Sequence, residues 1–231
     1  MTGSVYHAPP VSQRLTIEGP AGVLEARLDQ PVARQNQQAQ QASTSSPLSS
    51  PGAFAVLCHP HPLFAGTMDN KVVHTLAKAC NDLGMPALRF NFRGVGASQG
   101  AYADGLGETD DALAVVAEGH RRWPGARVWL GGFSFGAAVA VRAAAQVQPA
   151  RVVLVAPGVD RVDIAGLMPT CPWLVLLGDA DEVVSPARML EWAAGLQPPP
   201  RIQVLPGAGH YFHGRLNDVR EVVTGWAAPT S

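Results

Sequence analysis

The stretch GGFSFGAAVA, residues 131–140, is the most informative part of this chain. It places one serine between two phenylalanines and two glycines. A short apolar run (RVWLGG, residues 127–132) leads into Ser134, and an alanine-rich run follows it. The first run predicts a buried strand and the second a helix. Glycine on both sides removes side chains that would collide where a strand turns sharply into a helix. The stretch therefore predicts a nucleophile elbow, with the Ser134 hydroxyl exposed at the turn.

The same alternation of short apolar runs and amphipathic segments extends over the chain from residue 54. Buried strands bounded by Gly or Pro are predicted at residues 54–59, 86–92, 127–132, 151–156, 172–178 and 201–207. Helices are predicted between and after them, at residues 69–84, 108–123, 136–146, 186–196 and 216–227. Alternating strands and helices predict an α/β fold, a mostly parallel sheet of about seven or eight strands with helices on both faces.

Two segments near the N-terminus have a different pattern. Residues 14–19 and 22–29 alternate apolar and polar side chains around Gly19 and Pro20, which predicts an antiparallel pair at a sheet edge. Residues 31–52 are rich in Gln, Ser, Ala and Pro, which predicts a mobile low-complexity loop. A length of 231 residues fits one domain, so residues 1–231 are predicted to form a single unit.

The composition excludes several classes of protein. A net charge of −1 gives no electrostatic footprint for nucleic acid or an anionic membrane, so a small, weakly charged ligand is expected. Three widely spaced cysteines without a C-x-x-C pair argue against a disulfide framework or a zinc ribbon. No signal peptide and no apolar run of about 20 residues is evident. These features predict a soluble cytoplasmic protein, and they leave its oligomeric state open.

A serine hydroxyl becomes a useful nucleophile only beside a base, and that base must be oriented by a third group. The chain supplies both at the ends of later strands. Asp179, Asp181 and Glu182 follow the predicted strand 172–178, and His210 lies in a glycine-rich loop after the predicted strand 201–207. The chain order of serine, acid and histidine is that of α/β-hydrolases.

With these residues, the chain resembles the α/β-hydrolase-fold serine hydrolases. It is most similar to a small, lidless bacterial group, esterase- or acylpeptidase-like, whose core begins with the motif found here as HPHPLFAGTMDNKVV, residues 59–73. The resemblance extends over residues 14–226 apart from the Gln/Ser-rich insertion, and includes an R-G-x-G-x-S turn in FNFRGVGASQG, residues 90–100. The family pattern G-x-x-D-x-x-V falls on residues 178–184 and implies Asp181 as the acid, with Asp179 the weaker alternative. The resemblance implies His210 in GAGH, rather than His213, as the base.

Acyl transfer also needs two donors for the oxyanion. One is expected from the backbone N–H of Phe135, the residue after the nucleophile. The other is expected from the loop HPHPLFAGT, where Pro60 and Pro62 have no N–H; His61 or Leu63 is left, and the resemblance favours His61. Four side chains are predicted to line the substrate site: Leu63, Phe64, Phe133 and Tyr211. Residues 157–172 are too few for a cap domain, so a shallow site for small or short-chain acyl groups is expected.

Other interpretations fit the sequence less well. His59, His61 and His74 could suggest a metal site, but no carboxylate completes the H-x-H-x-D-H pattern of metallo-hydrolases, and a structural role for His59 is favoured. The GVGASQG turn lacks the third glycine and the helix of a dinucleotide-binding loop. The sequence therefore predicts a cofactor-free and metal-free serine esterase acting on a small-molecule ester. A peptidase or amidase acting on short acyl-peptides, or a non-catalytic binding module that kept the fold, are the alternatives.

Overall fold

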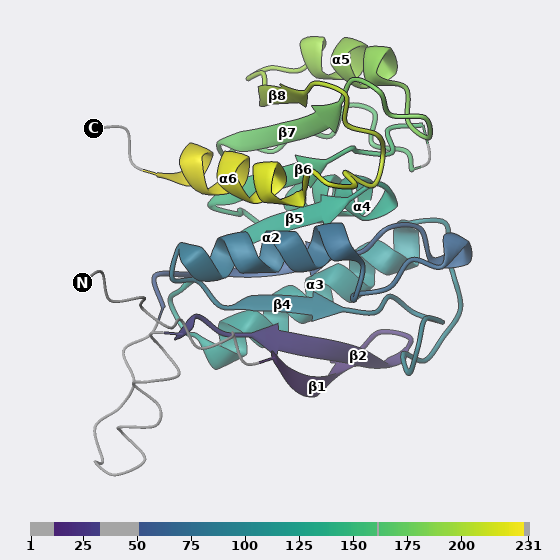
Figure 1. Cartoon of the computed structure of the whole chain (residues 1–231). Helices are drawn as coiled ribbons and strands as arrows, with labels where there is room; N and C mark the ends of the chain where they lie inside the picture. Colours follow the sequence, from purple (N-terminus) through teal and green to yellow (C-terminus); the bar gives the residue numbers. More distant parts are fainter. Residues whose placement is uncertain (1–11, 33–50, 161, 229–231) are drawn as a thin grey trace, which may run out of the picture.

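A computed structural model describes residues 12–32, 51–160 and 162–228 of the chain. Most of the loop predicted at residues 31–52 lies outside the described residues. The described part contains one sheet of eight strands (Figure 1). The strands are β1 (Ser12–Gly19), β2 (Gly22–Asp29), β3 (Ala53–Cys58), β4 (Ala87–Phe90), β5 (Arg127–Phe133), β6 (Arg151–Val155), β7 (Trp173–Gly178) and β8 (Arg201–Leu205).

The strand order is β1-β2-β4-β3-β5-β6-β7-β8. The predicted antiparallel pair at the edge is confirmed, since β1 pairs with β2 and β2 with β4 in antiparallel register. All remaining neighbours are parallel. After β3 the chain first adds β4 on one side and then β5 on the other, so the order reverses at β3. Ligands of open α/β sheets bind at the carboxyl ends of the strands at such a reversal.

Helices cover both faces of the sheet, as predicted (Figure 1). One apolar core lies beneath α2 (Lys71–Asp82) and α6 (Leu216–Ala227). The other lies beneath α3 (Leu106–Arg122), α4 (Phe135–Ala144) and α5 (Pro186–Ala194). The alanines of α4 are buried, and their small side chains allow this helix to lie close to the sheet. The fold is that of the α/β-hydrolases, and the described residues between β6 and β7 (156–160 and 162–172) contain no helix that could form a cap.

Several boundaries are shifted from the sequence prediction, two of them for a reason that the contacts show. Strand β4 ends at Phe90, not at residue 92, because the N–H of Phe92 donates to the ring of His59 instead of joining the strand ladder. Helix α2 begins at Lys71, not at residue 69, because the side chain of Asn70 caps its first turn. Both differences place polar residues in loops at the carboxyl end of the sheet. Within the described residues, no helix has the length and apolar character needed to cross a membrane.

Candidate active site

Ser134 lies on a strained turn between β5 and α4. Its φ of 56° and ψ of −119° put a residue with a side chain in a region that usually belongs to glycine. Glycines make the turn possible: a Cβ on Gly132 would lie 2.3 Å from the Gly136 carbonyl oxygen. A Cβ on Gly136 would lie 2.3 Å from the carbonyl oxygen of His59. The fold therefore holds the serine at the end of β5 by close backbone packing on both sides.

The loop after β8 brings His210 to this serine. Nε2 of His210 lies 3.1 Å from Ser134 Oγ, and Nδ1 lies 2.8 Å from Asp181 Oδ2. The three residues are 2–9% exposed, so little water competes for these hydrogen bonds. Residues separated by 76 and 29 positions in the chain thus form one hydrogen-bonded series, here called the relay.

Asp181 is held in place by its second oxygen. Oδ1 accepts hydrogen bonds from the N–H groups of Val183 (2.9 Å) and Val184 (2.8 Å). Burial raises the pKa of Asp181, but the hydrogen bonds from His210 and from these two amides outweigh it, so the pKa lies below its usual value. Asp179, the alternative acid, is exposed and accepts from the Gly207 N–H at 2.6 Å. The carboxylate beside His210 is therefore that of Asp181.

His59 is fully buried beneath the loop that follows β3. Its Nε2 accepts from the Phe92 N–H (3.0 Å), so Nδ1 carries the proton and donates to the Pro60 carbonyl (2.6 Å). Burial lowers the pKa of His59 to about 4, which keeps the ring neutral. Both ring nitrogens are thus used to connect loops around the site. Among the described residues, no group of three or more His, Cys, Asp or Glu side chains could hold a metal ion.

The backbone N–H groups predicted as oxyanion donors differ in whether they already have a hydrogen-bond partner. Phe135 is the first residue of α4, so its N–H has no carbonyl one turn earlier in the helix. The Leu63 N–H donates to Nδ1 of His61 (3.2 Å) and is therefore engaged in the loop itself. The His61 ring lies 4.7 Å from the Phe135 ring, which brings the loop after β3 against the start of α4.

A pocket of about 490 Å³ opens over the serine hydroxyl. It contains Ser134 and His210 and four of the residues predicted around the site or its oxyanion donors, namely His61, Phe64, Phe135 and Tyr211. It is also lined by residues that the sequence did not suggest: Pro60, Ala65, Asn70, Val183 and Val184. The long apolar side chains Phe64 and Tyr211 are 69% and 44% exposed, so the mouth of the pocket is apolar and accessible.

Two predicted substrate residues are placed elsewhere. Phe133 is fully buried and packs against the His210 ring, with centroids 4.8 Å apart, so it supports the imidazole and does not line the pocket. As the last residue of β5, Phe133 lies in the core under α2 and α6, and the pocket lining does not include it. Leu63 is 66% exposed and lies outside the pocket lining, beside Phe64 in a short 3₁₀ turn, Pro62–Phe64.

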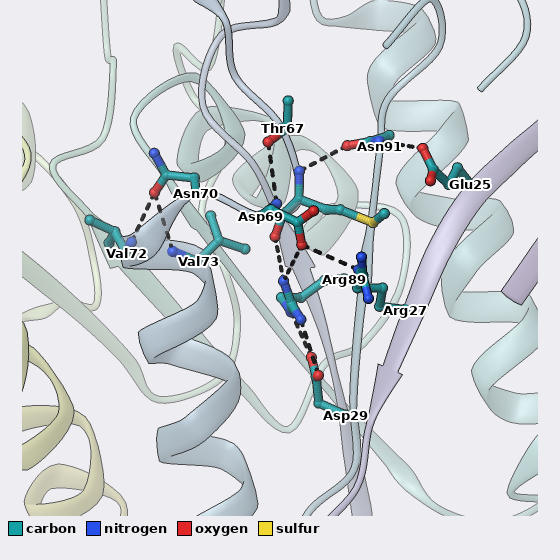
Figure 2. Close-up of polar contacts among 11 residues, drawn as sticks. Glu25, Arg27, Asp29, Thr67, Asp69, Asn70, Val72, Val73, Arg89 and Asn91 are labelled. Carbon is teal, nitrogen blue, oxygen red and sulfur yellow. Dashed lines mark hydrogen bonds and ion pairs between the residues drawn. The ribbon is translucent and has the colours of Figure 1, made fainter. Parts of the chain in front are cut away.

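A second polar cluster, which the sequence analysis missed, contacts the loop between β3 and α2 at Met68 and Asp69 (Figure 2). Arg89 of β4 is almost fully buried and makes a bidentate ion pair with Asp29 of β2. The sequence does carry a signal for it: a single arginine stands within the apolar run PALRFNF, and a buried arginine requires an acidic partner. The partner could not be identified because Asp29 is 60 residues away.

Known proteins resemble this chain along most of its length. A family model described as serine aminopeptidase, S33 (Hydrolase_4) matches residues 63–169, which include Ser134 and end before Asp181. The structure of an α/β serine hydrolase homologue from Coxiella burnetii is 39% identical, covers 94% of this chain and 97% of its own, and has a TM-score of 0.83.

The structure of XC6422 from Xanthomonas campestris, described as an α/β serine hydrolase without lid, is 36% identical with a TM-score of 0.84. It covers 97% of this chain and 99% of its own. An uncharacterized protein from Rickettsia prowazekii is 35% identical over 187 residues, which are 76% of this chain and 79% of that protein.

Proposed function

This chain belongs to the α/β serine hydrolases without a lid, and from that premise we propose that it hydrolyses small or short-chain carboxylic esters or thioesters. The proposal gives Ser134 the role of nucleophile, His210 that of general base and acid, and Asp181 that of the orienting carboxylate. The observation that carries it is the 3.1 Å contact between His210 Nε2 and Ser134 Oγ at the floor of an open pocket.

The proposed reaction follows from the protonation states that the contacts favour. Asp181 is ionised and accepts a hydrogen bond from the Nδ1–H of His210, so Nε2 is the free base that faces the hydroxyl. Nε2 takes the Ser134 proton as Oγ bonds to the carbonyl carbon. The tetrahedral intermediate then expels the alcohol or thiol, which receives that proton from His210. Water, activated by the same nitrogen, releases the acid and restores the serine.

The proposed oxyanion donors are the backbone N–H groups of Phe135 and His61. The first points from the N-terminal turn of α4, where the helix dipole also favours negative charge. The second belongs to the loop after β3, and its neighbour Leu63 already donates to the His61 ring. Loss of one such donor typically lowers kcat by about 10²–10³-fold.

The pocket favours compact acyl groups. Its volume of about 490 Å³ lies in the lower half of the range of about 300–1,000 Å³ for ligand sites, and the described residues form no cap above it. Phe64 and Tyr211 offer apolar contact at its mouth, and the exposed Leu63 is next to Phe64 in the chain. These features support short acyl groups over long ones.

A peptidase or amidase is the second candidate, because the family model that matches residues 63–169 carries the description serine aminopeptidase. The same relay cleaves an amide when the leaving amine can be protonated. The matched residues include Ser134 but not Asp181 or His210. The match therefore supports the fold and the turn at Ser134 more than it supports a peptide substrate.

Labelling and kinetics together test the proposal. A fluorophosphonate probe should label the wild-type protein and not Ser134→Ala. In a series of p-nitrophenyl esters, kcat/KM should be highest for acetate or butanoate and fall for octanoate, and amino-acid p-nitroanilides should react far more slowly. Faster turnover of the p-nitroanilides would establish the peptidase instead. Absence of labelling and of turnover would indicate a binding module that only kept the fold.

A further inference from the structure

Asn70 connects the pocket to the helix that begins behind it. It is the N-cap of α2, and its Oδ1 accepts from the N–H groups of Val72 (2.9 Å) and Val73 (3.4 Å). It is also one of the residues that line the pocket over Ser134. One side chain therefore serves the start of a helix and faces the place where substrate binds.

The cap fixes which way the amide group points. Backbone N–H groups can only donate, so the atom that faces them must be the oxygen of the Asn70 amide. The Nδ2 group, with two N–H donors, is then turned away from α2, as Figure 2 shows. Within residues 12–32, 51–160 and 162–228, no side chain or carbonyl accepts a hydrogen bond from it. Asn70 thus lines the pocket with an amide whose Nδ2 donor has a direction set by the cap before any ligand arrives.

The backbone before Asn70 is held equally firmly. The Met68 N–H donates to Asn91 Oδ1 (2.8 Å), and the Met68 carbonyl accepts from Nη1 of Arg89 (2.7 Å). Figure 2 shows the side chains of Arg89 and Asn91 close to Asp69, the residue that follows Met68. We call Arg89, Asp29, Asn91 and the Met68 backbone the Met68 clamp. It holds both backbone polar groups of Met68, the N–H and the C=O, two residues before Asn70.

The Met68 clamp is itself rigid because its charges are buried and paired. Arg89 Nε and Nη2 donate to the two oxygens of Asp29, at 2.6 and 3.0 Å. The side chains of Arg89 and Asp29 are 3% and 5% exposed. On the outer side, Asp69 accepts from Arg89 and pairs with Arg27, each at 3.2 Å. A strand pair in the sheet thus sets the position of a side chain in the pocket.

We propose that Asn70 is a specificity-determining residue whose Nδ2 donates a hydrogen bond to an acceptor oxygen of the substrate that lies outside the reacting ester group. The inference rests on the proposed ester hydrolysis and deepens it. The substrates it selects are short esters that carry a second oxygen, a ketone or ether oxygen for example, in the acyl or the alcohol part. A purely hydrocarbon ester leaves this donor unpaired when it displaces water from the pocket, which is costly.

The test compares pairs of esters that differ only in this oxygen. One pair is p-nitrophenyl 4-oxopentanoate and p-nitrophenyl pentanoate, which differ in the acyl part. The other is 2-methoxyethyl butanoate and butyl butanoate, which differ in the alcohol. The variant is Asn70→Ser, because serine also caps a helix and is neutral but lacks the amide donor. Asn70→Ala, which removes donor and cap together, is the control for the cap.

In at least one pair, Asn70→Ser should lower kcat/KM for the oxygen-bearing ester by about three- to tenfold, the worth of one neutral hydrogen bond. The hydrocarbon partner should change less than about twofold. Asn70→Ala should show the same selective loss together with a lower melting temperature, and both variants should still react with the fluorophosphonate probe. Equal losses within both pairs, or no loss in either, would overturn the inference and leave the esterase proposal intact. A wild-type protein that hydrolyses none of the four esters would remove the proposed function and this inference with it.

Discussion

The relay and the Met68 clamp are two buried polar networks, and they differ in how many of their hydrogen-bonding groups already have partners. The clamp uses every nitrogen of the Arg89 guanidinium and both oxygens of Asp29. The relay ends at the Ser134 hydroxyl, which faces an open pocket. A saturated network can only hold its neighbours in place, whereas one with an open end can transfer a proton to a ligand.

Backbone strain follows the same division. Ser134 adopts a positive φ that costs free energy, and glycines on both sides make room for it. The backbone of the clamp shows no positive φ at Asp29, Met68, Arg89 or Asn91. Ser134, which must project as the nucleophile, is therefore strained, and the four residues of the clamp are not.

The largest effect is expected from a substitution that disrupts the relay but leaves the protein folded. Asp181→Asn should lower kcat on a p-nitrophenyl ester by about 10⁴-fold, because an amide that donates toward Nδ1 forces the proton of His210 onto Nε2. The Asn oxygen can still accept from Val183 and Val184, so the melting temperature should change little. A loss of less than tenfold in steady-state kinetics would show that Asp181 does not orient the base.

Breaking the clamp should instead cost stability. Arg89→Met leaves the Asp29 carboxylate buried without its partner, and such a loss destabilises a protein by about 3–5 kcal/mol. Urea unfolding monitored by circular dichroism measures this change. The matched control is Arg89→Met with Asp29→Leu, which removes both charges and should recover most of the free energy. A double variant as unstable as the single one would assign the effect to the lost contact with the Met68 carbonyl.

The smallest expected effect is on the pH dependence of stability, and it follows from the difference between His59 and His210. His210 has one nitrogen facing a hydroxyl, whereas both nitrogens of His59 bind backbone groups. Burial lowers the pKa of His59 to about 4 from 6.5, so the unfolded chain binds a proton that the folded chain resists. Stability should therefore fall by about 3 kcal/mol as the pH drops from about 6.5 to 4, and remain constant above that window as far as His59 is concerned.

Unfolding free energies at pH 7, 5.5 and 4 measure this dependence. His59→Gln keeps one donor and one acceptor but cannot titrate, so its stability should decline less over the same range. Identical slopes for the two proteins would show that His59 is not the group responsible.

The fold could be predicted from the sequence because buried strands and amphipathic helices each have a characteristic spacing of apolar residues. Each predicted strand and helix is present, with ends shifted by a few residues where side chains such as His59 and Asn70 engage the backbone. The sequence also singled out Ser134, Asp181 and His210, which the structure brings within hydrogen-bond distance. Those positions could be found because each follows a strand end, where parallel strands meet at one edge of the sheet.

Only the tertiary structure decided the surroundings of these residues. Phe133 turned out to be a buried support for His210, and Asn70 turned out to face the pocket. The pairing of Arg89 with Asp29 depends on a strand order in which β2 lies beside β4, across 60 residues of chain. Local pattern determines which elements form and where they end, but the direction and burial of a side chain depend on neighbours that only the packed fold brings to it.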